Sequence, residues 1–150
     1  MCQVGITSGI DSVARNRTRA IVACTDPRIR QLLINVLHEL GLQPVGSETV
    51  GEIQALLAEG DTAMVLSQPR FTVGSFREVL RAAARPGSSV PVIVCSDFYD
   101  KDLYVEAMTL GAFDYLALPY RYEDVAWVLT NALTGGSLSQ TFSGTRVGAE

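Results

Sequence analysis

The segment Gly111-Ala-Phe-Asp-Tyr-Leu-Ala-Leu-Pro-Tyr120 gives the clearest indication of the fold. Its apolar run at 113–118 is bounded by a glycine on one side and by Pro119 on the other. This punctuation is typical of a short internal strand that is followed by an enforced turn. An internal strand needs neighbours, so we expect the rest of the chain to supply further strands and the helices that cover them.

The chain on both sides of this segment alternates between short apolar runs and longer amphipathic runs. We predict strands at 19–25, 42–45, 63–67, 90–96 and 113–118. We predict helices at 27–40, 49–58, 75–84 and 121–133, and one that begins after Asp97 or Asp100 and ends near 110. This alternation predicts a parallel sheet covered by helices on both faces, because each parallel crossover between strands needs a helix.

Punctuation residues support several of these boundaries. Asp26 can cap the helix at 27–40, Pro27 suits its first turn, and Gly41 suits a left-handed end. Pro44 favours an edge position for the second strand, because proline cannot donate to a sheet ladder. The β-branched run at 90–96 favours an internal position.

These elements predict an α/β domain with a flavodoxin-like, doubly wound sheet. Five parallel strands in the order 2-1-3-4-5 alternate with five helices. We expect residues 1–18 to form a flexible N-terminal arm, residues 19–133 to form the domain, and residues 134–150 to form a disordered tail or linker. In a longer protein an output domain would follow that tail.

Composition narrows the class of protein. Forty-seven per cent of the 150 residues are hydrophobic, which is ample for one core, but no run of about 18 apolar residues and no secretory signal is present. We expect a cytoplasmic protein without membrane contact. The net charge of −4 and the single lysine, Lys101, leave no basic stripe, so we expect no direct binding of nucleic acid.

The three cysteines, Cys2, Cys24 and Cys95, are widely spaced, and this favours reduced thiols over a disulfide framework or a zinc site. Strands one and four should lie about 9–10 Å apart with strand three between them. A disulfide needs Cα atoms within about 7 Å, so we do not expect Cys24 and Cys95 to pair. No metal or cofactor is expected.

The segment at 111–120 resembles the last strand and following turn of response-regulator receiver domains, where "G-A-x-x-Y-L-x-K-P-F" places a lysine before the proline. The resemblance covers roughly residues 19–133. It implies a phosphorylation pocket at the carboxyl ends of the strands, with two acids that hold Mg²⁺, an acceptor aspartate, a Ser or Thr, and the lysine. Leu118 stands where the lysine is expected.

The other pocket positions implied by the resemblance are also altered. Cys24 and Thr25 stand in place of the two acids, and Ser67 stands in place of the acceptor aspartate. Ser96 matches the Ser or Thr, although a serine at a strand end also commonly satisfies local backbone groups. We interpret this set as a degenerate phosphorylation pocket. Asp26 and Asp97 together would make at most a weak cation site, and we favour a helix cap and a loop acid.

The resemblance further implies that the fourth helix, fifth strand and fifth helix form a surface for dimerisation and partner docking. Aromatic residues with charges around them are typical of interfaces. The alternative is that Tyr115 and some of the others pack in the core, while Trp127 lies off the apolar stripe of its helix and is the foremost exposed candidate. The interface candidates are Tyr99, Tyr104, Tyr115, Tyr120, Tyr122 and Trp127.

We therefore predict a pseudo-receiver that acts in signal transduction through phosphorylation-independent contact with a protein partner or through a homodimer. We do not expect an enzyme, because the only histidine, His38, lies on the first helix, away from the strand ends, and no glycine-rich phosphate loop follows the first strand. The alternative is a small-molecule-sensing or enzymatic flavodoxin-like domain that uses the neutralised pocket.

Overall fold

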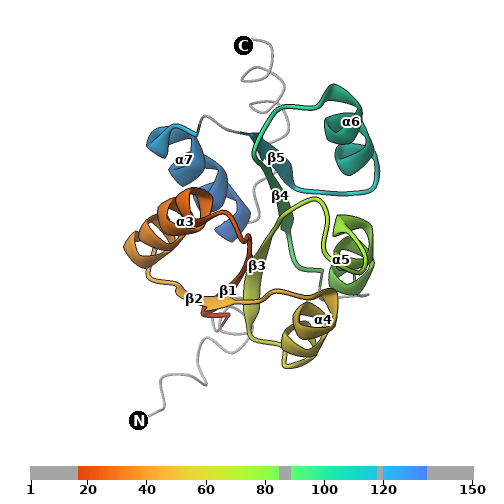
Figure 1. The fold of residues 1–150 in the computed structure, drawn as a ribbon. Helices are drawn as coiled ribbons and strands as arrows, with labels where there is room; N and C mark the ends of the chain where they lie inside the picture. Colours follow the sequence, from red (N-terminus) through yellow and green to blue (C-terminus); the bar gives the residue numbers. More distant parts are fainter. Residues whose placement is uncertain (1–16, 85–88, 118–119, 135–150) are drawn as a thin grey trace.

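A five-stranded parallel sheet forms the centre of the molecule (Figure 1). The computed structural model describes residues 17–84, 89–117 and 120–134. The strand order is β2-β1-β3-β4-β5, which confirms the predicted flavodoxin-like sheet with β2 at an edge. The strands are β1 (Arg19–Ala23), β2 (Gln43–Gly46), β3 (Thr62–Ser67), β4 (Val92–Ser96) and β5 (Asp114–Ala117).

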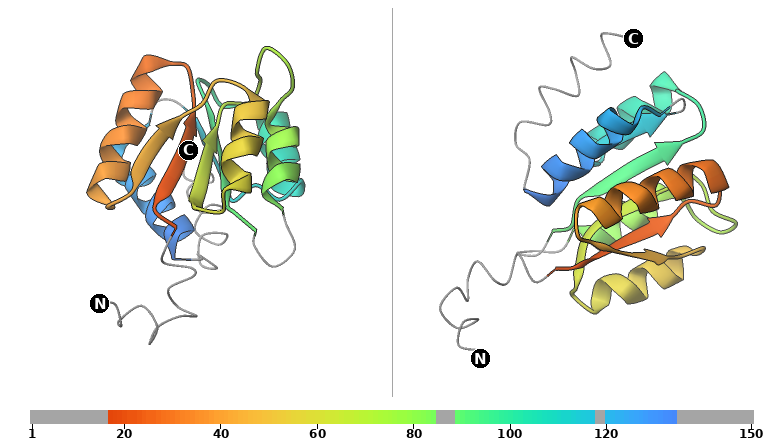
Figure 2. Two further views of the ribbon diagram at one scale, coloured as in Figure 1. Left: turned by 90° about the horizontal axis from the view of Figure 1, so that it is seen from below. Right: turned by 90° about the vertical axis from the view of Figure 1, so that its left-hand side faces the viewer.

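Helices cover both faces of the sheet (Figure 2). One layer contains α3 and α7, and the other contains α4, α5 and α6. This arrangement explains why the strands read as nearly continuous apolar runs rather than as alternating ones. The helices are α3 (Pro27–Glu39), α4 (Val50–Ala58), α5 (Phe76–Ala83), α6 (Lys101–Thr109) and α7 (Tyr122–Leu133).

The predicted helix signals act as expected at several ends. The Asp26 side chain accepts a hydrogen bond of 2.9 Å from the Arg28 amide and caps α3, whose first residue is Pro27. Gly41 follows that helix with a φ of 80°, a conformation that glycine adopts without strain. Asp100, one of the two residues considered, caps α6 by accepting a bond from the Leu103 amide.

Two hydrophobic cores lie on opposite faces of the sheet. Val22, Leu66 and Ile93 face α3 and α7, where the predicted apolar stripe of α7 is buried. The residues next to them in sequence, such as Val65 and Val94, face the other three helices. Because side chains alternate along a strand, a slip of one residue would exchange the two cores, so the register is strongly fixed.

At the edge where the carboxyl ends of the strands meet, β3 and β4 end where predicted, whereas β1 is shorter than predicted. β1 ends at Ala23 rather than at Thr25, because the Thr25 amide bonds to the Gln68 side chain and not to a strand. The predicted end of the fifth strand at Leu118 lies outside the described residues. So do residues 1–16 of the predicted arm and residues 135–150 of the predicted tail, whereas Thr18, placed in the arm, bonds to Asp61.

None of the helices in the described part of the chain combines the length and the apolar character needed to cross a membrane.

Candidate functional site

A cavity of about 250 Å³ opens at the carboxyl ends of β1, β3 and β4. This is the edge at which parallel α/β sheets commonly bind ligands. Loops after the three strands form most of its wall, and α3 and α6 contribute one apolar side chain each. The lining residues are Cys24, Thr25, Asp26, Ile29, Gln68, Pro69, Arg70, Cys95, Ser96, Asp97, Phe98 and Leu103.

Gln68 connects two loops across this cavity. Its Oε1 atom accepts hydrogen bonds from the Thr25 amide at 2.9 Å and from the Thr25 hydroxyl at 3.1 Å. Its Nε2 atom donates to the Arg70 carbonyl at 2.9 Å. The carboxamide is neutral and engaged at both ends, so it supplies neither the negative oxygen that Mg²⁺ prefers nor an oxygen nucleophile.

Ser67 does not line the cavity, so the predicted acceptor position is wrong by one residue. Its side chain is fully buried, and its hydroxyl donates to the Gln68 carbonyl at 2.8 Å. The physical reason is strand alternation: Ser67 shares its face with Val65, whereas Gln68 follows Leu66 toward the α3 and α7 side. Alternation along β3 was the sequence signal that could have identified Gln68.

Cys24 and Thr25 line the cavity at the end of β1, as expected. Neither offers a carboxylate. Asp26 does, but its carboxylate caps α3 and pairs with Arg28 at 3.0 Å. The hydrogen bond from the Arg28 side chain lowers the pKa of Asp26, so this acid is held as an ion by the cap and the guanidinium.

Asp97 is exposed on the opposite wall and favours the charged form of Arg28 through its own charge. The positive charge of Arg28 is thus paired with Asp26 and favoured by Asp97, and a positive charge beside these acids disfavours a bound cation. Within the described residues, no group of three or more His, Cys, Asp or Glu side chains is arranged to hold a metal ion.

Cys24 and Cys95 are nearly fully buried and are free thiols. The Cys24 side chain is a hydrogen-bond partner of Cys95, and this contact together with burial raises the pKa of the Cys95 thiol well above its usual value. The Tyr120 hydroxyl is a further partner of Cys95. The sequence placed the two cysteines on strands that are not neighbours, and the structure adds that both belong to one buried cluster and line one cavity.

Tyr120 is partly buried and therefore a weak interface candidate. Its hydroxyl lies 3.0 Å from the Ser96 carbonyl and 3.3 Å from the Leu116 carbonyl, to either of which it donates. Burial raises the pKa of this phenol far above its usual value. Tyr120 thus joins the ends of β4 and β5 beneath the cavity.

Ser96 lines the cavity at the end of β4, and its hydroxyl accepts a hydrogen bond of 3.3 Å from the Phe98 amide. This bond belongs to the local-backbone role that we considered for it. Leu118, the last of the predicted pocket positions, lies outside the described residues.

Tyr115 belongs to the core and not to the exposed interface. Only 4% of it is exposed, and its hydroxyl donates to the Phe98 carbonyl at 3.3 Å. Its ring meets those of Tyr99 and Tyr104 edge to face, at centroid distances of 6.2 and 5.9 Å. Tyr99 is 44% exposed and Tyr104 is half-buried, so this aromatic trio runs from the core to the surface.

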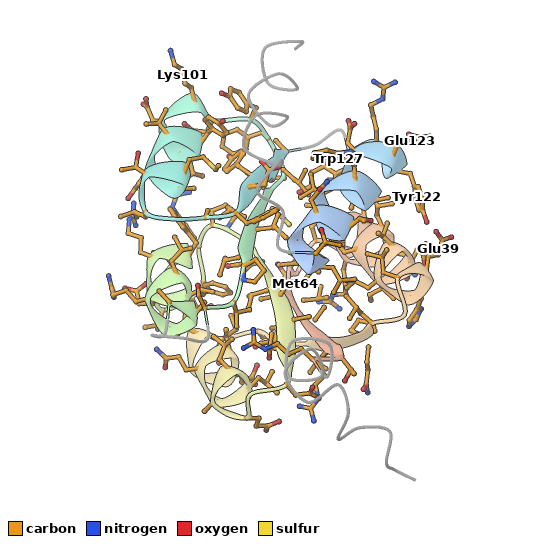
Figure 3. All side chains as sticks on the ribbon, turned by 180° about the vertical axis from the view of Figure 1, so that it is seen from behind. Glu39, Met64, Lys101, Tyr122, Glu123 and Trp127 are labelled. Carbon is orange, nitrogen blue, oxygen red and sulfur yellow. The ribbon has the colours of Figure 1, made fainter. Side chains whose placement is uncertain are left out.

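The two interface candidates on α7, Trp127 and Tyr122, both contact other parts of the domain. Trp127 is partly buried against the core between α3 and α7, so it is not the most exposed aromatic residue. Tyr122 is exposed at 37%, and its hydroxyl donates to Glu39 on α3 (Figure 3). The shared α3–α7 packing therefore engages both side chains.

Comparison with known proteins relates the chain to bacterial signalling proteins. No protein-family model matches it. It is 27% identical over 104 residues to the response regulator protein PilR of Pseudomonas aeruginosa PAO1, and 28% identical over 109 residues to the DNA-binding transcriptional regulator NtrC of Salmonella typhimurium LT2. These matches cover 69% and 73% of this chain but only 23% of each relative. The chain thus spans about a quarter of the length of these curated relatives.

Solved structures show the same fold. A response regulator receiver domain protein from Clostridium thermocellum has a TM-score of 0.68 and 22% identity, covering 81% of this chain and 98% of that one. The beryllofluoride-activated NtrC4 receiver domain dimer has a TM-score of 0.70 and 21% identity, covering 79% and 98%. The chain therefore has the fold of response-regulator receiver domains, and its sequence similarity to response regulators supports a receiver domain here.

Proposed function

We propose that this chain is a pseudo-receiver, which acts in signal transduction through protein contact and without phosphorylation. The observation that best supports the proposal is the neutral, hydrogen-bonded side chain of Gln68 at the end of β3. This neutral side chain lines the cavity at the end of β3 and bridges Thr25 and Arg70 through three hydrogen bonds. It leaves no carboxylate at the centre of the cavity to accept a phosphoryl group.

The surrounding side chains favour the same conclusion. Phosphoryl transfer relies on Mg²⁺ and on positioned charge, and Mg²⁺ is bound through carboxylates. Cys24 and Thr25 provide none at the end of β1, and the carboxylate of Asp26 is occupied by the helix cap and Arg28. Ser67, the nearest hydroxyl on β3, is buried away from the cavity and bonded to backbone.

A docking surface is available beside the altered cavity. Phe98 and Tyr99 precede α6 and are 54% and 44% exposed, and Val105 and Leu110 on α6 are each 49% exposed. The buried ring of Tyr115 packs edge to face against the ring of Tyr99. Exposed aromatic side chains that rest on a rigid core are suited to interface anchors. We propose that this α6 surface binds a protein partner or a second copy of the chain.

The cavity favours this function over a small-molecule sensor or an enzyme. Ligand pockets usually measure about 300–1,000 Å³, and this one is smaller, at about 250 Å³. Its polar groups at Gln68 and Ser96 are engaged with the protein itself.

Two experiments test the two parts of the proposal. Incubation with acetyl phosphate and Mg²⁺, followed by intact-protein mass spectrometry, should give no phosphorylated species. A phosphorylated species that disappears on Ser67→Ala or Gln68→Ala would contradict the loss of phosphorylation.

For the surface, sedimentation equilibrium should show self-association, or a pull-down should retain a signalling protein, and Phe98→Ala with Tyr99→Ala should abolish it. Val73→Ala is the matched control, because Val73 is 81% exposed on the loop between β3 and α5. Equal binding by all variants would refute the proposed surface.

A further inference from the structure

We propose that Cys24 and Cys95 form a buried two-thiolate site for a soft monovalent metal ion, of which Cu(I) is the type. The proposal is independent of the pseudo-receiver function and departs from our expectation that the chain holds no metal. It rests on where the sheet places the two sulfur atoms, on the cavity beside them and on the ligand preference of such ions.

The register of the sheet aligns the two cysteines. Ala23 on β1 pairs with Ser67 on β3, and Ser67 pairs with Val94 on β4. Cys24, Gln68 and Cys95 each follow directly after these three paired residues. Both thiols point to the α3 and α7 side, where they belong to the same buried cluster and border the same cavity.

The Gln68 carboxamide has hydrogen-bond partners other than the two thiols. It bonds to Thr25 and Arg70 in the loops that follow β1 and β3. The Cys24 and Cys95 side chains are both nearly fully buried. Each thiol also has a backbone carbonyl acceptor at 3.8 Å, Leu66 for Cys24 and Ile93 for Cys95.

The spacing of the strands suits a metal bridge better than a disulfide. Strands separated by one other strand lie about 9–10 Å apart, and a disulfide, with its S–S bond of about 2.05 Å, spans Cα atoms up to about 6.8 Å apart. Two metal–sulfur bonds of about 2.3 Å on opposite sides of one ion separate the sulfurs by about 4.6 Å. The metal bridge is about 2.5 Å longer and so reaches about 9.3 Å between Cα atoms, which matches the strand spacing.

The ligand set selects the class of ion. Thiolates are soft ligands that favour Cu(I), zinc and iron–sulfur clusters. Structural zinc takes four ligands, whereas within the described residues no third Cys, His, Asp or Glu joins this pair. With two thiolate ligands, the site suits a soft metal ion that is stable with two ligands, such as Cu(I). On binding, each thiol releases one proton to solvent, and two S–Cu bonds form without any change in oxidation state.

Neighbouring groups bear on the charge of such a site. Two thiolates and one monovalent cation carry a net charge of −1. The Tyr120 hydroxyl stabilises the Cys95 thiolate, whereas the Asp114 carboxylate opposes it. Arg30 brings a guanidinium to the Cys24 carbonyl, at 3.1 Å from its Nε atom. Metal binding to a thiol displaces its proton, so affinity at this site depends on pH.

The test is an anaerobic competition titration, in which Cu(I) is shared between the full chain and a chromogenic Cu(I) chelator. Wild type should withdraw one ion per chain, and Cys24→Ser and Cys95→Ser should each weaken binding by at least about 100-fold, because changes to outer-shell partners alone cost about 10- to 100-fold. Tyr120→Phe should weaken it by about tenfold. Cys2→Ser is the matched control and should bind as wild type does.

Circular dichroism checks that each variant is folded. If Cys24→Ser or Cys95→Ser is unfolded, the alanine variants replace them, and Ag(I) added to wild type should shift the amide resonances of residues 24, 68 and 95. Failure of wild type to compete with the chelator, binding that survives both substitutions, or binding lost only in Cys2→Ser would overturn the proposal.

Discussion

The two sides of the strand-end cavity differ in their chemistry. On the β1 and β3 side, Thr25 and Gln68 bond to each other, and the lining carboxylate of Asp26 is engaged by the α3 cap and by Arg28. On the β4 and β5 side, Ser96 and Tyr115 stand at the positions that the receiver resemblance gives them, and both connect to Phe98. On the side where a receiver would bind a phosphoryl group, the polar side chains are hydrogen-bonded to each other. On the side next to α6, Ser96 and Tyr115 both bond to Phe98.

This difference bears on how the fold and the chemistry of the strand ends can vary separately. The cores fix the sheet and helices independently of the cavity, because they consist of apolar side chains on both sheet faces. Substitutions at the strand ends then change chemistry without changing the fold. The β1 and β3 side of the cavity, below called the sealed half, therefore differs from the β4 and β5 side, below called the connecting half. Variants on each half test whether this difference is real.

The largest expected effect lies on the connecting half. Tyr115→Ala should lower the free energy of unfolding by about 3–5 kcal/mol, because it removes a large buried ring and its contacts with Tyr99 and Tyr104. Tyr115→Phe is the control and should cost about 1 kcal/mol, since only the bond to the Phe98 carbonyl is lost. Urea unfolding measures both. Equal losses for the two variants would mean that the hydroxyl, and not the ring, connects the core to the surface.

A smaller effect is expected on the sealed half. Gln68→Ala should cost about 1–2 kcal/mol, because it removes three hydrogen bonds at a partly exposed site. A double-mutant cycle with Thr25→Val isolates the pair, and we expect a coupling of about 1 kcal/mol. Additive effects would show that the two side chains do not act together and that the cavity is not closed in this way.

The strand order, the edge position of β2 and the α3 cap were predictable from sequence, because they depend on local signals such as Asp26, Pro27 and Pro44. The position of Gln68 was not, because an apolar run does not reveal which of its last residues turns toward the cavity. The proximity of Cys24 and Cys95 likewise depends on side chains that converge over an intervening strand. Tyr115 and Trp127 lie in a sequence context that does not separate a buried ring from an exposed one.

A third variant should affect binding while leaving stability nearly unchanged. Phe98→Ala should change the free energy of unfolding by no more than about 0.5 kcal/mol, because more than half of Phe98 is exposed. The same variant should lose most of the proposed association through the α6 surface. Thermal unfolding and sedimentation, measured on the same sample, check the two effects. A large loss of stability would place Phe98 in the core instead of at the interface.

A further, small effect concerns pH and two exposed ion pairs, one beside the cavity and one between α5 and α6. Hydrogen bonds from Arg28 and Arg77 lower the pKa values of Asp26 and Glu106 below their usual values of 3.8 and 4.5. A carboxyl whose pKa is lower in the folded state stabilises the fold above its unfolded-state pKa, and this contribution is lost as the pH falls through the folded-state value. We therefore expect stability to decline below about pH 4.5.

Arg28→Ala and Arg77→Ala should each flatten this acid dependence slightly, because the pairs are exposed and screened. Melting temperatures recorded from about pH 6 to pH 3, at low and high salt, check it. An unchanged profile in both variants would assign the acid dependence to other carboxyls.

The pseudo-receiver proposal is best tested by a titration with beryllofluoride and Mg²⁺ followed by amide NMR, because this reagent mimics a phosphoryl group on an aspartate and requires the metal site. We expect no saturable shifts at Thr25, Gln68 or Ser96. Saturable shifts at these three residues would show that the cavity still assembles a metal and phosphoryl site, and would contradict the claim that its β1 and β3 side is sealed.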